Sequence, residues 1–146
     1  MRSCTFIGHR DCSSEIVLKL YNVIEALILK EQIKCFYVGN HGGFDKCVYT
    51  VLCDLKKKYD IRINVVLAYL ENNNRYYDMN DTIFPSVLDN VPLRYAINKR
   101  NIYMIEQSEY MVCYLNHTFT NTYKYVKKAI SKKLKIYNIG ECSIEL

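Results

Sequence analysis

Short apolar runs alternate with longer amphipathic stretches along this chain of 146 residues. The apolar runs predict five strands, at Cys4–Ile7, Cys35–Val38, Ile63–Leu70, Tyr110–Leu115 and Leu134–Ile139. Between them, apolar residues recur at spacings of three and four, the period of a helix with one buried face. These stretches predict four helices, at residues 13–31, Phe44–Tyr59, Leu93–Gln107 and Thr120–Lys133. Such alternation is typical of α/β proteins.

Two local features refine this pattern. Ser13 or Ser14 can cap the first helix, because a serine hydroxyl accepts from the free N–H groups of the first turn. The polar segment Glu71–Pro92 separates the third strand from the third helix and holds both prolines of the chain. Loops of this length are uncommon in compact domains and often serve as lids, so we expect this one to close over a ligand.

The strands indicate the kind of sheet. Val65, Val66, Leu67 and Ala68 form a continuous apolar run, as expected for a strand covered on both faces. We therefore predict a Rossmann-like, doubly wound α/β fold with a mainly parallel sheet of about five strands, forming one domain over residues 1–146. Ligands of such folds bind at the carboxyl ends of the strands, where the strand order reverses.

Two glycine-bearing turns carry the first candidate site residues. Each follows a predicted strand and opens a helix, an arrangement that presents backbone N–H groups and a positive dipole end to an anion. Gly8 would let a ligand approach the backbone closely. The guanidinium of Arg10 could donate two hydrogen bonds to one phosphate or carboxylate. The candidates from these turns are Gly8, His9, Arg10, Gly39, Asn40, Gly42, Gly43 and Asp45. The spacing fits neither the dinucleotide fingerprint nor the P-loop, so neither kind of site is predicted.

The third helix and the turn after the fourth strand supply the remaining candidates. Arg94, Asn98 and Asn101 share one edge of the predicted helix, and Asn101 needs polar partners because its neighbours are apolar. Arg100 is either solvated or turned toward the crevice. Thr118 follows the fourth strand at the same expected edge of the sheet.

Charge and cysteine content limit the partners and the compartment. The formal net charge is +5, which favours an anionic partner only weakly. Much of the excess lies late in the chain, at Lys124, Lys127, Lys128, Lys132, Lys133 and Lys135. Lysines at helical spacing usually form a solvated face, so nucleic-acid binding is the less favoured interpretation. Seven scattered cysteines without a CxxC pair fit a reducing cytoplasm better than a disulfide framework.

The sequence supports neither a secreted or membrane protein nor a metal site. It contains neither a leader pattern nor an apolar stretch long enough to span a bilayer, so we expect a cytoplasmic protein without a membrane partner. His9 and Cys12 could approach His41 and Cys47, since both pairs follow strand ends. Their spacing matches no recognised zinc pattern, so we predict no metal and no cofactor.

Four segments resemble the SLOG superfamily of Rossmann-like proteins, which groups the DNA-processing protein A family with the lonely-guy phosphoribohydrolases. The likeness is strongest to its small single-domain bacterial branch. The segments span nearly the whole chain in matching order, at residues 6–12, 36–45, 91–97 and 99–108. The resemblance implies a pocket for a nucleotide or nucleotide derivative, and a homo-oligomer, either a dimer or larger.

One departure from the family pattern bears on catalysis. Lonely-guy enzymes pair an arginine with a glutamate from a glycine-rich turn after the fourth strand. Arg100, followed by Met104, matches the arginine, so it is the candidate catalytic residue. The turn after Leu115 contains no glycine and no acid, and Tyr123 or Lys124 stands near the expected glutamate. Glycosidic cleavage therefore lacks its obvious base.

Three hypotheses follow. The first is binding of a nucleotide or nucleotide-derived small molecule, such as a signal, without turnover. The second is an N-glycosidic hydrolase acting on a nucleoside monophosphate or related molecule, with the lost glutamate replaced by Asp45, Asp81 or Glu106. The third is a nucleic-acid-binding module that uses the late lysines; the modest net charge and the lack of an aromatic stacking array disfavour it.

Overall fold

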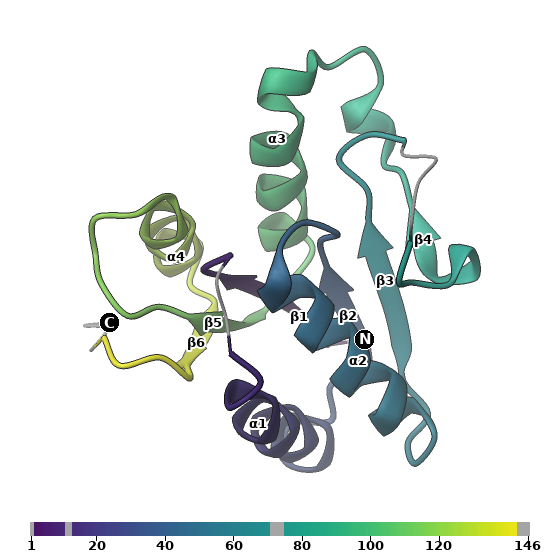
Figure 1. The fold of residues 1–146 in the computed structure, drawn as a ribbon, viewed down its shortest axis with the longest axis vertical. Helices are drawn as coiled ribbons and strands as arrows, with labels where there is room; N and C mark the ends of the chain where they lie inside the picture. Colours follow the sequence, from purple (N-terminus) through teal and green to yellow (C-terminus); the bar gives the residue numbers. More distant parts are fainter. Residues whose placement is uncertain (1, 11–12, 71–74, 143–146) are drawn as a thin grey trace.

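A six-stranded parallel sheet forms the centre of the molecule in the computed structural model, which describes residues 2–10, 13–70 and 75–142 (Figure 1). The strand order is β4-β3-β2-β1-β5-β6, and every neighbouring pair is parallel. The strands are β1 (Ser3–Gly8), β2 (Cys35–Val38), β3 (Arg62–Val66), β4 (Thr82–Ile83), β5 (Tyr110–Tyr114) and β6 (Lys135–Asn138). The predicted Rossmann-like, doubly wound α/β class is confirmed.

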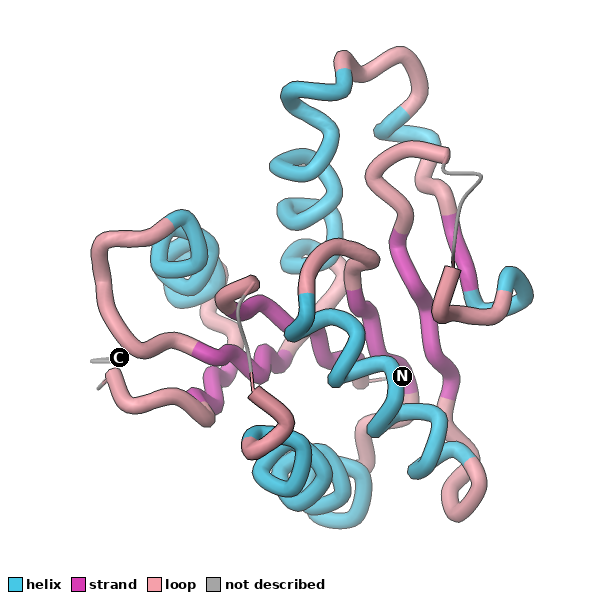
Figure 2. Tube along the Cα trace, viewed as in Figure 1, coloured by secondary structure: helices cyan, strands magenta, loops and turns pink. Residues whose placement is uncertain are grey.

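Four helices cover the two faces of this sheet (Figures 1 and 2). They are α1 (Ile16–Lys30), α2 (Gly43–Lys56), α3 (Leu93–Glu106) and α4 (Asn121–Ser131). Helices α1 and α2 pack on one face, in a core that includes Phe6 and Phe36. Helices α3 and α4 pack on the other, against Ile7 and Met111. Because adjacent strand residues such as Phe6 and Ile7 point to opposite faces, each strand needs apolar residues at consecutive positions.

The structure differs from the predicted elements in three places. A sixth strand, β4, pairs with β3 through Val65↔Thr82 and Val66↔Ile83, inside the segment predicted to be a loop. The same segment holds two 3₁₀ turns, η1 (Met79–Asp81) and η2 (Ser86–Leu88). Strand β3 ends at Val66 rather than at Leu70.

The expected serine cap of α1 is also absent. Glu15 precedes the helix and makes no side-chain cap bond. The carbonyl oxygens of Ser13 and Ser14 instead accept from the backbone N–H groups of Ile16 and Val17, so these serines form a turn that leads into the helix. Within the described parts of the chain, no helix has the length and apolar character needed to cross a membrane.

Candidate functional site

A cavity of about 510 Å³ opens at the carboxyl ends of the central strands. It lies where β1 has β2 on one side and β5 on the other, the point at which the strand order reverses. Ligands of doubly wound sheets bind at such a point because the loops that follow neighbouring strands diverge there. The segment that follows each strand contributes to the wall, with His9 and Arg10 after β1, His41 after β2, and Asn116 and His117 after β5.

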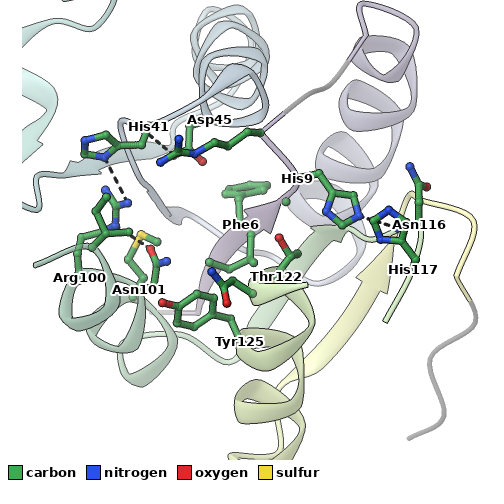
Figure 3. A pocket seen from close by; sticks show the side chains of 16 residues that line it. Phe6, His9, His41, Asp45, Arg100, Asn101, Asn116, His117, Thr122 and Tyr125 are labelled. Carbon is green, nitrogen blue, oxygen red and sulfur yellow. Dashed lines mark hydrogen bonds between the residues drawn. The ribbon is translucent and has the colours of Figure 1, made fainter. Parts of the chain in front are cut away.

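The first turns of two helices also line this cavity. Asp45 comes from α2, and Asn121 and Thr122 come from α4 (Figure 3). The first turn of an α-helix leaves backbone N–H groups without intrahelical acceptors and carries the positive end of the dipole. Thr120 caps α4, because its hydroxyl oxygen accepts from the N–H of Tyr123 at 3.4 Å. The cavity therefore suits a negatively charged group near α4.

Arg100 forms the innermost wall and is held rigidly. Only 2% of the residue is exposed. Its Nε donates to Asn101 Oδ1 at 2.8 Å, and its Nη1 donates to Asn40 Oδ1 at 3.0 Å and to the Val66 carbonyl at 3.1 Å. These bonds join α3, the turn after β2 and the end of β3. Burial lowers the pKa of Arg100, and the nearby charge of Asp45 opposes that shift.

His41 has a defined tautomer as a result. Its Nδ1 lies 3.5 Å from Arg100 Nη2, and its Nε2 lies 3.0 Å from the Tyr69 hydroxyl. A guanidinium can only donate, so Nδ1 of His41 accepts and the proton lies on Nε2, which donates to Tyr69. The ring is thereby fixed at the edge of the cavity (Figure 3).

Asp45 is the one carboxylate in the described lining of the cavity. It accepts from the backbone N–H of His41 at 3.0 Å, which fixes the turn that leads into α2. Burial raises the pKa of Asp45 to about 6, while the Arg100 charge and the bond from His41 act in the opposite direction. A carboxyl group with this pKa exchanges its proton near neutral pH, as acid–base catalysis requires.

His9 holds the opposite wall. Its Nε2 accepts from the backbone N–H of Asn116 at 2.9 Å, so the neutral ring carries its proton on Nδ1. The rings of His9 and His117 lie 4.8 Å apart, centroid to centroid. Burial lowers the pKa of His9, and the positive charge that His117 can carry lowers it further. With His41, these are all three histidines of the chain.

Comparisons with known proteins agree with this architecture. A family model described as the YspA SLOG family matches residues 9–143. The chain belongs to the YspA SLOG family. A search of curated proteins found no match. The X-ray structure of DNA processing protein A from Streptococcus pneumoniae is similar, with a TM-score of 0.67 and 14% identity. That match covers 98% of this chain and 51% of the other, so the chain spans about half its length, and the similarity shows the fold alone.

The sequence-predicted site residues of this SLOG protein divide into two groups. The structure brings six of them together in the cavity wall: Gly8, His9, Arg10, Asp45, Arg100 and Asn101. The other seven do not line it: Gly39, Asn40, Gly42, Gly43, Arg94, Asn98 and Thr118. Most residues of this second group contact other protein groups near the cavity instead. Asn40 bonds Arg100, Asn98 accepts from the Tyr125 hydroxyl at 2.9 Å, and Arg94 lies over the ring of Tyr95.

The glycines near the site make room for other protein groups. A Cβ on Gly8 would lie 2.5 Å from the Phe44 ring. A Cβ on Gly39 would lie 2.7 Å from Asp45 Oδ2 and 2.8 Å from the Arg100 guanidinium. Gly39 therefore lets the buried arginine and the carboxylate meet beside the end of β2. The structure provides this reason for both glycines, whereas the sequence suggested close approach of a ligand.

Gly42 is required for its backbone conformation. Its φ of 91° lies in the region that side-chain-bearing residues rarely adopt. The turn also packs against the other glycine-bearing turn, because the Gly43 N–H donates to the Arg10 carbonyl at 3.0 Å. The two turns are therefore joined beside the cavity, which the first turn lines with Gly8, His9 and Arg10 and the second with His41.

Ten lining residues are not among the site residues predicted from the sequence. They are Phe6, Ile7, His41, Ile97, Met104, Asn116, His117, Asn121, Thr122 and Tyr125. His41 and Asn116 lie within turns that the sequence places at this edge, and topology decides which of their side chains face inward. None of the described residues of the 71–92 segment lines the cavity; Asp78 and Asp81 instead bond the Tyr49 hydroxyl.

The described residues were compared with the metal site that the sequence analysis considered. Among the described residues, no group of three or more His, Cys, Asp or Glu side chains is arranged to hold a metal ion. Cys12, one of the four residues considered, lies outside the described residues, as does Asp11 of the first turn.

Proposed function

We propose that this SLOG protein binds a nucleotide or a nucleotide-derived small molecule in the cavity between β1 and β5. The observation that carries the proposal is the convergence of Arg10 with the first turn of α4 at the point where the strand order reverses. This arrangement offers an exposed cation and free backbone N–H groups to one anionic group. A phosphate is the natural occupant.

The rest of the cavity suits a sugar and a base. Phe6, Ile97 and Met104 supply apolar surface, and Tyr125 projects from α4 toward the same space (Figure 3). Asn101 reaches the cavity, and its Oδ1 is already occupied by Arg100, so its amide N–H groups remain to donate. A pocket with apolar walls and a few fixed polar groups is the usual form of a small-molecule site.

Calorimetric titration with ribonucleoside 5′-monophosphates tests this proposal. We expect at least one of AMP, GMP, CMP or UMP to bind, and Arg10→Ala to weaken it by about tenfold or more, since a charge-assisted hydrogen bond contributes roughly 1.5–3 kcal/mol. Arg94→Ala is the matched control, because Arg94 is also exposed and lies outside the cavity. Equal effects of the two substitutions would refute the site, and no binding by any nucleotide would refute the function.

Hydrolysis of an N-glycosidic bond is the second candidate, and the position of Asp45 favours it. Of the three acids suggested by the sequence, only Asp45 lines the cavity; Asp81 bonds Tyr49, and Glu106 is exposed. An ionised Asp45 could accept the proton of the water that attacks the sugar C1′ as the bond to the base breaks, and the departing base takes up a proton in return, from Asp45 or from solvent. Arg100 would orient the site through Asn40 and His41.

Release of free base distinguishes the two candidates. If the chain is a hydrolase, incubation with a bound monophosphate yields base and ribose 5-phosphate, and Asp45→Asn abolishes this turnover while binding persists. Glu106→Gln serves as the control, because it removes a carboxylate that does not line the cavity. Absence of base release from every bound nucleotide would leave binding alone.

A further inference from the structure

A second groove continues from the main cavity along α4. It has a volume of about 380 Å³ and shares two of its lining residues, Asn121 and Tyr125, with the main cavity. The other residues that line it are Asn98, Ile102, Lys124 and Lys128. The two spaces share these residues and therefore lie side by side at the start of α4, so a ligand that reaches past Tyr125 would contact both.

The lining follows from helix geometry. Asn121, Lys124, Tyr125 and Lys128 are spaced three or four apart and therefore lie on one face of α4. Asn98 and Ile102 are likewise one turn apart on α3. The groove runs between these two helices, and the hydrogen bond from the Tyr125 hydroxyl to Asn98 Oδ1 crosses it at 2.9 Å. That bond fixes Tyr125 at the boundary between the two spaces.

The groove is positively charged. Within the part of the chain that the structure describes, no acidic residue lines it, and neither Lys124 nor Lys128 forms an ion pair. Two lysines four apart lie on the same face of a helix and repel each other. Lys127, by contrast, lies over the ring of Tyr123 and does not line the groove. The late lysines are therefore not one uniform solvated face.

From these observations we infer that the ligand carries a second anionic group, which Lys124 and Lys128 bind. This inference rests on the proposed function and specifies it: the ligand is a small nucleotide with two separated phosphates, one near Arg10 and the first turn of α4, the other beyond Tyr125. Asn98 and Asn121 add hydrogen-bonding groups along the path. A mononucleotide with a single phosphate would leave the groove empty.

Matched mono- and bisphosphates test the inference. The four nucleoside 5′-monophosphates and the four nucleoside 3′,5′-bisphosphates are titrated by calorimetry. For the base that binds, we expect the bisphosphate to bind about tenfold more tightly. Lys124→Met combined with Lys128→Met removes that advantage and leaves the monophosphate affinity unchanged. Lys127→Met combined with Lys132→Met makes the same change of charge outside the groove and retains the advantage.

Each other outcome has a distinct meaning. Binding of monophosphates with no gain from the second phosphate, or an equal loss in both double variants, would overturn the inference and leave the proposed function standing. No binding of any mononucleotide would overturn the proposed function itself. A 5′-phosphorylated tetranucleotide that binds more tightly than every bisphosphate, through the same two lysines, would replace the small ligand with a nucleic-acid strand.

Discussion

Arg100 is the residue that the resemblance to lonely-guy enzymes makes the candidate catalytic residue, yet most of its N–H groups donate to other protein groups. Nε and Nη1 together make three bonds to Asn101, Asn40 and Val66. The sequence left open whether this arginine is solvated or turned inward. Its partners come from segments 34 and 60 residues away, so only the folded topology reveals the burial.

At the same scale, the raised pKa of Asp45 predicts that the stability of the protein depends on pH. Its pKa is about 6 in the folded protein, raised by burial, whereas an exposed aspartate has a pKa of about 3.9. Between these values the folded state binds more protons than the unfolded state, so this group makes folding less favourable as pH rises from about 4 to 6. Asp45→Asn removes this decrease in stability, because the asparagine side chain does not ionise.

Urea unfolding at several pH values measures this effect. We expect the free energy of unfolding of Asp45→Asn, relative to the natural protein, to increase as pH rises from about 4 to 6 and to level off above that. Glu106→Gln, on the exposed surface, should show no such trend. A relative stability that does not change between pH 4 and 8 would contradict the predicted ionisation.

The lowered pKa of His9 predicts the opposite pH dependence, with stability falling as pH decreases. Its pKa is lowered by burial and by His117, and its neutral Nε2 accepts from the Asn116 N–H. Below a pH of about 6.5, the unfolded chain takes up the proton first, so this group reduces stability as pH falls. His9→Asn, whose amide oxygen can accept the same bond, should lose less stability than the natural protein between pH 7 and 5 in urea unfolding. Equal losses would contradict the prediction.

At the scale of elements, the sequence predicts types well and ends less well. Strand β2 has the predicted bounds, Cys35–Val38, because a tight apolar run ends at Gly39. Strand β4 is not predicted from the sequence, because its two residues, Thr82 and Ile83, are too few to show the alternation of apolar and polar positions that marks a strand. The shortened β3 has a related cause: Leu67 and Ala68 are buried, so their apolar character reflects core packing beyond the last strand pair.

The turn that opens α2 predicts a contrast between neighbouring glycines. Gly42→Ala forces a side chain into a backbone with φ of 91° and against Arg10, and such strain costs about 1–3 kcal/mol. Gly43 is the first residue of α2, where alanine is the better helix former, so Gly43→Ala should be neutral or mildly stabilising. Chemical denaturation of both variants makes the comparison. Equal destabilisation would show that crowding, not conformation, sets the cost.

At the scale of the whole molecule, the doubly wound plan was evident because strand and helix alternate throughout the chain. Six of the predicted site residues meet in the cavity for the same reason: parallel strands bring their following loops to one edge. What the sequence could not specify is the choice of inward-facing side chains. Tyr125 and His117 lack any pattern of their own and face the cavity because of how α4 and the loop before it pack.

The cysteines give a prediction for the whole fold. Cys4, Cys35 and Cys113 are free thiols, and all three are buried. Burial raises the pKa of Cys113 to about 12, and that of Cys4 rises for the same reason. These thiols should not react with a thiol-specific reagent until the protein unfolds. A colorimetric thiol count of native and denatured protein checks this, and full reactivity in the native state would contradict the described packing.

The three histidines surround one cavity, and the chain has no others. Their imidazole carbon-bound protons resonate apart from most other signals in a proton NMR spectrum. Every such signal therefore comes from a ring at the wall of the site. A simple one-dimensional spectrum of unlabelled protein becomes a reporter of occupancy without background: a ligand that enters the cavity shifts these resonances, and one that binds elsewhere leaves them in place.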